Sequence, residues 1–133
     1  MKTLIASIAC AALALGAAGP VAAIDRTARG EQRLAKMIEG RTAGTPVSCI
    51  NTNRSSGLQV IDRTAVVYDG GKTVYVARPK DPRQLDDFDV LVINRFSPSQ
   101  LCVHDQMRTV DPQSGFTTGV VFLDGFVPYT KEG

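Results

Sequence analysis

The sequence predicts an α+β fold in which one N-terminal helix accompanies an antiparallel sheet of six or seven strands, or a small barrel. Two observations favour this class. Only one stretch, near the N-terminus, has apolar residues at helical spacing. The remainder consists of short β-branched runs separated by turn residues roughly every 8–12 positions. With 133 residues, the chain has the length of one domain and not two.

The first 23 residues have the pattern of a secretory signal peptide. Lys2 supplies a short positive start, residues 4–18 form an apolar run, and Val21-Ala22-Ala23 is a small-residue cleavage site. The apolar run is too short for a comfortable membrane span. We therefore expect cleavage near Ala23 and a periplasmic or secreted bacterial protein. The alternative is a leader that is kept as an N-terminal anchor.

Residues 24–45 are predicted to form the N-terminal helix and a linker, ahead of a β-rich domain at 46–130. Within 24–41 an apolar side recurs at helical spacing, and Gly40 followed by Gly44-Thr45-Pro46 ends the helix. That apolar side consists of Ala28, Leu34, Ala35 and Ile38, with Met37 at its margin. Glu31 falls within it, which conflicts with the pattern.

A basic stripe runs along the opposite side of the predicted helix. Its members are spaced three, four and three residues apart: Arg26, Arg29, Arg33 and Lys36. A solvated helix face is the simpler interpretation. The alternative is contact with anionic lipid headgroups at a membrane surface.

The stretch 58–79 is predicted to hold a tight β-hairpin. Asp69-Gly70-Gly71-Lys72 separates two β-branched runs, and Gly-Gly supplies the positive φ angles of a two-residue turn. A loop at Gly70 and Gly71 would place Val67 opposite Val74. Both faces of this hairpin are apolar, so we expect both to be covered.

Further strands are predicted on either side of the hairpin. A helical turn is expected at 84–87, and the strand at 90–96 is apolar enough to be central in the sheet. Asp124-Gly125 is expected to end the last strand. The remaining predicted strands are 47–51, 59–62, 64–69, 73–78, 107–110 and 116–123.

Two cysteines remain once Cys10 has left with the leader. In an exported chain, Cys49 and Cys102 are expected to form one disulfide. The bridge would close a loop of about 53 residues, for which the chain-entropy model gives about 4 kcal/mol of stabilisation.

Cys102, His104 and Asp105 form the one cluster that suggests chemistry. Cys102 and His104 point the same way in an extended segment, so Cys49 could join them around zinc or copper. A Cys102 thiolate with His104 as base is the enzymatic alternative. Both need reduced cysteines, so we expect no metal, cofactor or catalytic residue in the oxidised protein.

Charge and motifs exclude several other classes. Fifteen Lys and Arg residues against 13 Asp and Glu residues do not favour nucleic acid. The acidic stretch around Asp86, Asp87 and Asp89 lacks the spacing of a calcium loop and is expected to be solvated. Contact with an anionic ligand is the remaining possibility, through residues at or near strand ends: Arg78, Arg95 and His104.

Short motifs along the chain resemble a family of small exported bacterial proteins classed as a domain of unknown function. They are Ser48-Cys49-Ile50, Val60-Ile61-Asp62, Lys72 to Tyr75, Gln100 to Asp105, and Gly125-Phe126-Val127-Pro128. The resemblance covers about 47–129 and implies an exported β-rich fold with no established activity.

The chain departs from that family at two positions. Asp81 and Val121 stand where the family carries two further cysteines, so the resemblance leaves Cys49 and Cys102 as a pair. Together, these observations predict a non-enzymatic binding or envelope-interaction domain. The alternative is an enzyme or metal-binding protein centred on Cys102, His104 and Asp105. The sequence does not indicate a ligand, a partner or an oligomeric state.

Overall fold

The computed structural model describes residues 25–53 and 57–132. The predicted signal peptide lies outside these ranges. The helices are α1 (Arg26–Met37) and the short 3₁₀ helix η1 (Pro82–Gln84). The strands are β1 (Arg41–Ala43), β2 (Cys49–Asn51), β3 (Leu58–Ile61), β4 (Ala65–Asp69), β5 (Thr73–Pro79), β6 (Val90–Asn94), β7 (Gln100–Cys102), β8 (Gln106–Val110), β9 (Thr117–Val121) and β10 (Leu123–Lys131).

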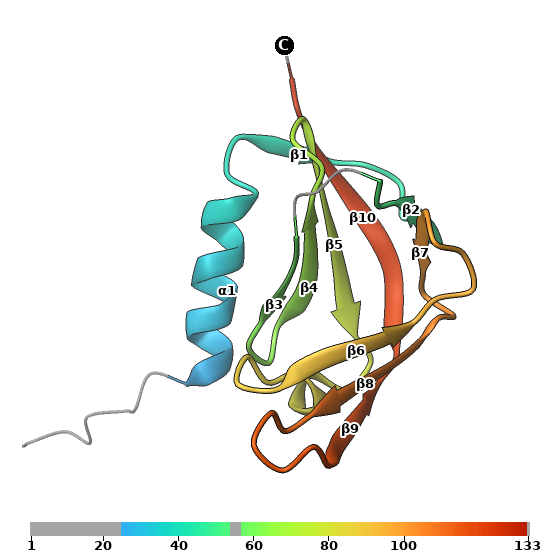
Figure 1. Ribbon diagram of the computed structural model, residues 1–133. Helices are drawn as coiled ribbons and strands as arrows, with labels where there is room; N and C mark the ends of the chain where they lie inside the picture. Colours follow the sequence, from blue (N-terminus) through green and yellow to red (C-terminus); the bar gives the residue numbers. More distant parts are fainter. Residues whose placement is uncertain (1–24, 54–56, 133) are drawn as a thin grey trace, which may run out of the picture.

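The ten described strands form three antiparallel sheets. The largest has the order β1-β10-β5-β4-β3, the second joins β6-β8-β9, and the third is the pair β2-β7. Helix α1 covers one face of the five-stranded sheet, and the two smaller sheets lie on its other side (Figure 1). The described part is mainly β with one α-helix, so the predicted combination of a helix with antiparallel strands is found. The single sheet of six or seven strands and the small barrel are not, because the described strands divide into three sheets and do not close.

Two apolar clusters fill the space on the two faces of the large sheet. The helix side holds Leu34, Ile61, Ala65, Val67, Val74 and Val76. The other side holds Ile50, Val66, Tyr68, Ala77, Leu85, Leu101, Met107, Val121, Leu123 and Phe126. The expectation that both faces of the hairpin are covered is confirmed.

Helix α1 begins where Asp25 accepts a hydrogen bond from the Thr27 amide, at 3.3 Å. It ends shortly before Gly40, which has a φ of +71°. Leu34 is buried on the sheet, whereas Ala28 and Ala35 are exposed. The predicted apolar side was therefore partly wrong. The helix instead contacts the sheet through Gly30 and Leu34. At Gly30 its backbone lies against the β3–β4 turn, and Leu34 packs in the cluster on the helix side.

The β4–β5 hairpin has the predicted faces but a different register. Tyr68 pairs with Tyr75 and Val67 with Val76, so each partner is two residues further along than predicted. The Gly70 amide donates to the Thr73 carbonyl at 2.9 Å, which leaves Gly71 and Lys72 as the loop. Gly71 has a φ of +89° and its amide donates to the Asp69 carboxylate. A shift of two residues keeps every side chain on its face.

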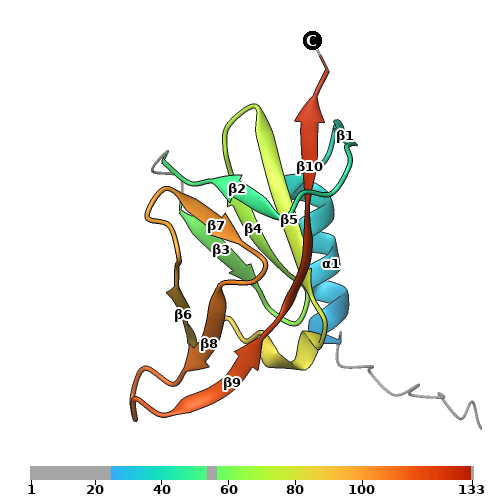
Figure 2. The ribbon, with the colours of Figure 1, turned by 90° about the vertical axis from the view of Figure 1, so that its right-hand side faces the viewer.

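Strand β10 was not predicted, yet it lies between β1 and β5 and is the longest of the described strands. A register shift between Leu123 and Phe126 absorbs Asp124 and Gly125, the two residues expected to end the last strand. Pro128 is tolerated because β1 ends beside it, where its carbonyl accepts from the Gly44 amide. Figure 2 shows β9 leading directly into β10, which joins the small sheet to the large one.

One further expectation is corrected by the sheet order. Strand β6 was predicted to be central, but it is an edge strand paired only with β8.

Residues 24–45 were predicted to form a helix and linker ahead of the β-rich domain. Within the described part of this range, β1 pairs with β10 and α1 packs on the same five-stranded sheet.

Candidate functional site

The pair Cys49 and Cys102 forms the predicted disulfide. The two residues lie opposite each other on β2 and β7, with 4.0 Å between their Cα atoms. Their neighbours Ile50 and Leu101 are buried in the larger core cluster. The disulfide therefore cross-links β2 and β7, the two strands of this small sheet, at the edge of the core.

Asp105 shapes the turn that follows β7. Its buried carboxylate accepts hydrogen bonds from the Cys102 amide at 2.8 Å and the Phe96 amide at 3.1 Å. Its own amide donates to the Cys102 carbonyl. A buried carboxylate with two backbone donors is a structural group, because both of its oxygens are occupied.

The oxidised protein does not contain the catalytic arrangement considered for Cys102, His104 and Asp105. The Cys102 sulfur is bonded to Cys49, and the Asp105 carboxylate faces backbone amides. His104 is exposed, and its ring lies 5.8 Å from the Phe96 ring, measured between centroids. A thiolate nucleophile with a histidine base is therefore not assembled in this state.

The three residues considered for an anionic ligand do not converge. Arg78 donates two hydrogen bonds to the Glu31 carboxylate on the helix side, at 2.6 and 3.0 Å. Arg95 donates to the Thr52 hydroxyl. Of the three, only His104 borders the hollow on the β6-β8-β9 sheet that is described below. The Arg78 ion pair also explains why Glu31 interrupts the apolar side of the helix.

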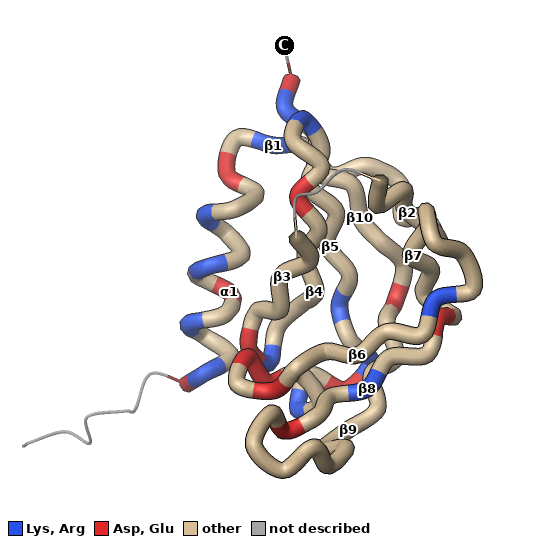
Figure 3. Tube along the Cα trace, viewed as in Figure 1, with Lys and Arg blue, Asp and Glu red and all other residues tan. Residues whose placement is uncertain are grey.

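The basic stripe of α1 is divided between a structural arginine and exposed cations. Arg26 donates to Asp62 at 2.7 Å and to Asp86 at 3.3 Å. These contacts, the Asp62 hydrogen bond foremost, raise the pKa of Arg26. The exposed part of the stripe follows the outer side of the helix (Figure 3) and consists of Arg29, Arg33 and Lys36.

Acidic residues gather near the first turn of the helix. Carboxylate oxygens of Asp62, Asp86 and Asp87 lie within 4.8 Å of one another. Arg26 already bridges Asp62 and Asp86, so a cation of the protein itself occupies this cluster. Asp89 accepts a hydrogen bond from Thr118. The stretch predicted to be a solvated acidic loop is therefore partly tied to the fold.

A hollow lies on the β6-β8-β9 sheet, beside the β7–β8 turn. It encloses about 580 Å³, within the range of small-ligand sites. Its apolar lining consists of Val103, Met107, Val120, Val121 and Phe122. Its polar lining consists of Asn94, His104, Asp105, Gln106 and Arg108. Arg108 takes part in no ion pair with any residue that the structure describes.

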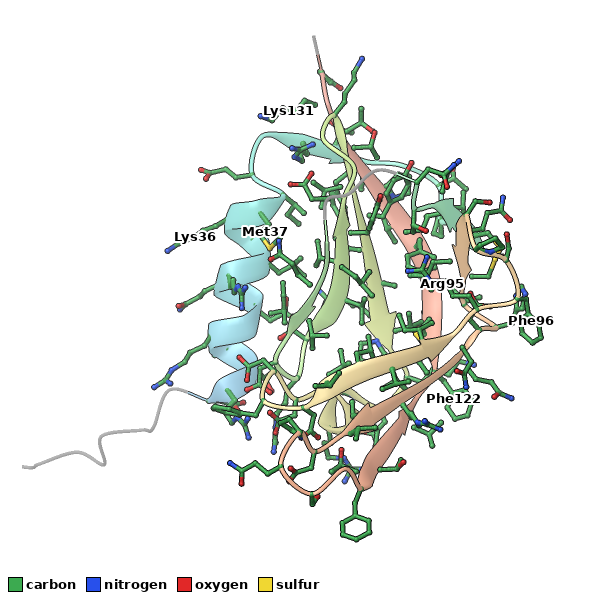
Figure 4. The ribbon with its side chains drawn as sticks, viewed as in Figure 1. Lys36, Met37, Arg95, Phe96, Phe122 and Lys131 are labelled. Carbon is green, nitrogen blue, oxygen red and sulfur yellow. A yellow bond between two sulfur atoms is a disulfide. The ribbon has the colours of Figure 1, made fainter. Side chains whose placement is uncertain are left out.

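Exposed aromatic rings surround the same sheet. Four of the five phenylalanines are 64–77% exposed, which leaves only Phe126 in the core. Each exposed ring lies within two residues of an end of β6 or β9: Phe88, Phe96, Phe116 and Phe122. In Figure 4, Phe96 and Phe122 are on the side of the molecule where β6 and β8 meet the β7 turn. Of these four rings, Phe122 lines the hollow, whereas Phe88 lies on the helix side, 6.0 Å from the Arg26 guanidinium.

Sequence reasoning identified His104 but not the hollow beside it. A signal that sequence reasoning could have used is the position of Phe88, Phe96 and Phe116, which have polar or turn residues beside them. Phe122 lies within the apolar run 120–123 and gives no such signal. The hollow itself could not be derived, because it depends on how β8, β9 and the β7–β8 turn are arranged.

Comparison with protein-family models, curated proteins and solved structures found no match. The resemblance to a family of exported proteins therefore stays a prediction. Among the described residues, no helix has the length and apolarity needed to cross a membrane.

Proposed function

We propose that this chain is a non-enzymatic, exported binding protein for an amphipathic molecule that has a hydrocarbon part and an anionic group. The hollow on the β6-β8-β9 sheet is the observation that carries this proposal. Export is supported by the leader pattern at 1–23 and by the Cys49–Cys102 disulfide, which suits an oxidising compartment.

The hydrocarbon part is argued from the exposed apolar lining of the hollow. Val120 and Phe122 line it and are half or more exposed, whereas the side chains of Met107 and Val121, which also border it, are almost fully buried in the core. A hydrocarbon chain on this surface would cover apolar area that now faces water, at about 25 cal/mol per Å².

The anionic group is argued from charge. Arg108 borders the hollow, is exposed and has no ion-pair partner among the described residues. The one carboxylate in the lining belongs to Asp105, whose oxygens already accept two backbone amides. A guanidinium without a partner beside an apolar surface is a suitable contact for a carboxylate or phosphate.

Binding is favoured over catalysis because the available groups do not form a reaction centre. Both cysteines are in the disulfide, and the Asp105 carboxylate is held by backbone amides. His104 contributes an imidazole ring at the rim of the hollow. It would bind or orient an anionic group and would not activate a nucleophile of this chain.

Titration with dodecanoate below its micellar concentration tests the proposal, followed by amide chemical shifts. We expect one molecule to bind and to shift resonances of Val103, Gln106 and Val121. Dodecyl maltoside should bind more weakly and dodecyltrimethylammonium weakest, because only dodecanoate offers an anion to Arg108. An absence of binding by all three surfactants would overturn the proposal, and equal binding would remove its anionic part.

Two valines provide a matched pair of variants. Val120 and Val90 belong to the same sheet and are both 51% exposed, but only Val120 lines the hollow. Val120→Asp should abolish dodecanoate binding, and Val90→Asp should leave it unchanged. Arg108→Gln should weaken dodecanoate binding about tenfold, the loss of one charge-assisted contact, without affecting dodecyl maltoside. Arg33→Gln on the helix is its control.

The same chemistry could be presented by a free molecule or by a membrane. Vesicles of phosphatidylglycerol distinguish the two sources. If the natural ligand is a free molecule, the protein should not sediment with the vesicles, and the vesicles should not compete with dodecanoate for binding. Sedimentation lost in Val120→Asp would assign the hollow to lipid headgroups and chains at a bilayer surface.

A further inference from the structure

Three metal-ligating side chains converge at the edge of the two-stranded sheet. The two sulfurs of Cys49 and Cys102 and a ring nitrogen of His104 all lie within 4.8 Å of one another. In the oxidised protein the sulfurs are bonded to each other and cannot act as thiolate ligands. We propose that reduction of this disulfide creates a zinc-class metal site with Cys49, Cys102 and His104 as ligands and one open coordination position.

The donor set matches the preferences of zinc. Zn²⁺ binds thiolate sulfur at about 2.3 Å and imidazole nitrogen at about 2.0 Å, in tetrahedral geometry. The two sulfurs would have to separate to about 3.8 Å, which is the edge of such a tetrahedron. His104 is exposed and joins the site from the β7–β8 turn by a change of rotamer. Three protein ligands leave the fourth position for water or an external group.

The backbone that carries these ligands is held by contacts that do not involve sulfur. Cys49 and Cys102 are opposite residues in the β2-β7 register, with Cα atoms 4.0 Å apart. The Val103 amide donates to the Ser48 carbonyl, and the Asp105 carboxylate accepts from the Cys102 amide. Breaking the sulfur–sulfur bond leaves these hydrogen bonds in place, so the ligands stay close together.

The reaction needs a dithiol reductant, which could be a small dithiol or a dithiol protein. A reductant thiolate attacks the Cys49 sulfur, which is more accessible than the buried Cys102. The mixed disulfide is resolved by the second reductant thiol. The protein then holds two thiols and the reductant holds a disulfide. Metal binding displaces one proton from each thiol. Exchange with an external disulfide re-forms the Cys49–Cys102 bond, reduces that disulfide to two thiols and releases the ion.

This site is independent of the amphipathic ligand proposed above. His104 borders the hollow as well, but neither sulfur lines it. The two proposals also differ in state, because the hollow is present in the oxidised protein. Failure of either experiment therefore leaves the other unaffected.

Cobalt is the probe for the test, since thiolate-to-cobalt charge transfer absorbs in the near ultraviolet. The full mature chain is reduced, freed of reductant without oxygen, and titrated with Co²⁺ and then Zn²⁺. We expect the reduced protein to bind one Co²⁺ with this absorption, and Zn²⁺ to displace it. The oxidised protein should show no absorption.

Variants separate the site from a simple dithiol. Loss of a second-shell partner of a metal ligand typically costs 10–100-fold in affinity, so His104→Ala should cost more than roughly 100-fold. Gln106→Ala, in the next strand, should have no effect. Cys49→His cannot form the disulfide and should bind Co²⁺ without any reductant.

Three results would overturn the proposal. One is a reduced protein that gives no charge-transfer absorption while its amide spectrum stays folded. Another is a chain that unfolds on reduction and is not refolded by Zn²⁺. The third is unchanged affinity in His104→Ala, which would assign the metal to the two thiolates alone.

Discussion

Gly30 of α1 lies directly against Thr64 of the β3–β4 turn, with no room between them for a methyl group. A Cβ at Gly30 would overlap the Thr64 hydroxyl oxygen and lie 2.6 Å from the Asp62 carbonyl oxygen. Thr64 cannot turn away easily, because it is buried and its hydroxyl donates to that carbonyl. Glycine at this position therefore sets the distance between the helix and the sheet.

Replacement of this glycine should destabilise the protein, although alanine is the better helix former. Gly30→Ala gains about 1 kcal/mol of helix propensity. The overlap forces a backbone shift, and overpacking of this kind costs about 1–3 kcal/mol. The backbone contact with Asp62 places the cost at the upper end. We expect a net loss of about 1–2 kcal/mol in urea denaturation. Gln32→Ala, on the exposed side of α1, is the control and should not destabilise. A more stable Gly30→Ala would show that the helix moves freely.

The ion pair between Glu31 and Arg78 predicts a small pH dependence of stability. Two hydrogen bonds from Arg78 lower the pKa of the Glu31 carboxyl below its ordinary 4.5. Because the folded pKa is depressed, the stabilisation is present above 4.5 and is lost as the pH falls through the folded value. The side chains are 46% and 51% exposed, so solvent screening limits the pair to less than about 1 kcal/mol.

The test compares wild type with Glu31→Gln by denaturation at neutral pH and well below 4.5. The variant should be less stable at neutral pH, equal in acid, and closer to wild type in high salt. Glu39→Gln is the control, because Glu39 is exposed and has no ion pair among the described residues. A difference that persists in acid would assign the effect to packing.

The sequence predicted the parts of the fold that depend on local pattern. Alternating β-branched runs and turn residues located most strands. The register of the β4–β5 hairpin was wrong because its turn is selected by the Asp69 contact with the Gly71 amide as well as by glycine content. Strand β10 was missed because a glycine such as Gly125 usually marks the end of a strand. The bulge that lets the strand continue through this glycine depends on pairing partners far away in the chain.

The candidate site was likewise predictable only where local sequence pattern determines it. The disulfide followed from counting cysteines in an exported chain. The partner of Arg78 could not be predicted, because Glu31 is 47 residues away and meets it only when α1 packs on the sheet. The hollow depends on the pairing of β8 with β9, and no local pattern encodes it. The sequence could indicate that the phenylalanines are exposed only through their positions next to strand ends.

Removal of the disulfide should cost a large part of the stability. The bridge joins residues 53 positions apart, and closing a loop of that length contributes about 4 kcal/mol in the chain-entropy model. Cys49→Ala combined with Cys102→Ala should therefore lower the free energy of unfolding by about that amount in urea. Reductant should destabilise the wild type similarly and leave the double variant unchanged. Equal midpoints for wild type with and without reductant would contradict the prediction.

The Asp105 carboxylate should stabilise the protein because both of its oxygens accept hydrogen bonds, and not only because it is charged. Asp105→Asn keeps the size but replaces one acceptor oxygen by a donor, so either the Cys102 or the Phe96 amide would lose its partner. Leaving a buried donor unsatisfied costs about 1–3 kcal/mol, and we expect a loss of this size in chemical denaturation. Asp124→Asn, at an exposed position, should change stability by less than about 0.5 kcal/mol. Amide hydrogen exchange identifies the mechanism, because Cys102 and Phe96 should exchange faster in Asp105→Asn and not in Asp124→Asn. An equally stable variant with unchanged exchange at both amides would show that the turn is held by the disulfide and the β2-β7 pairing instead.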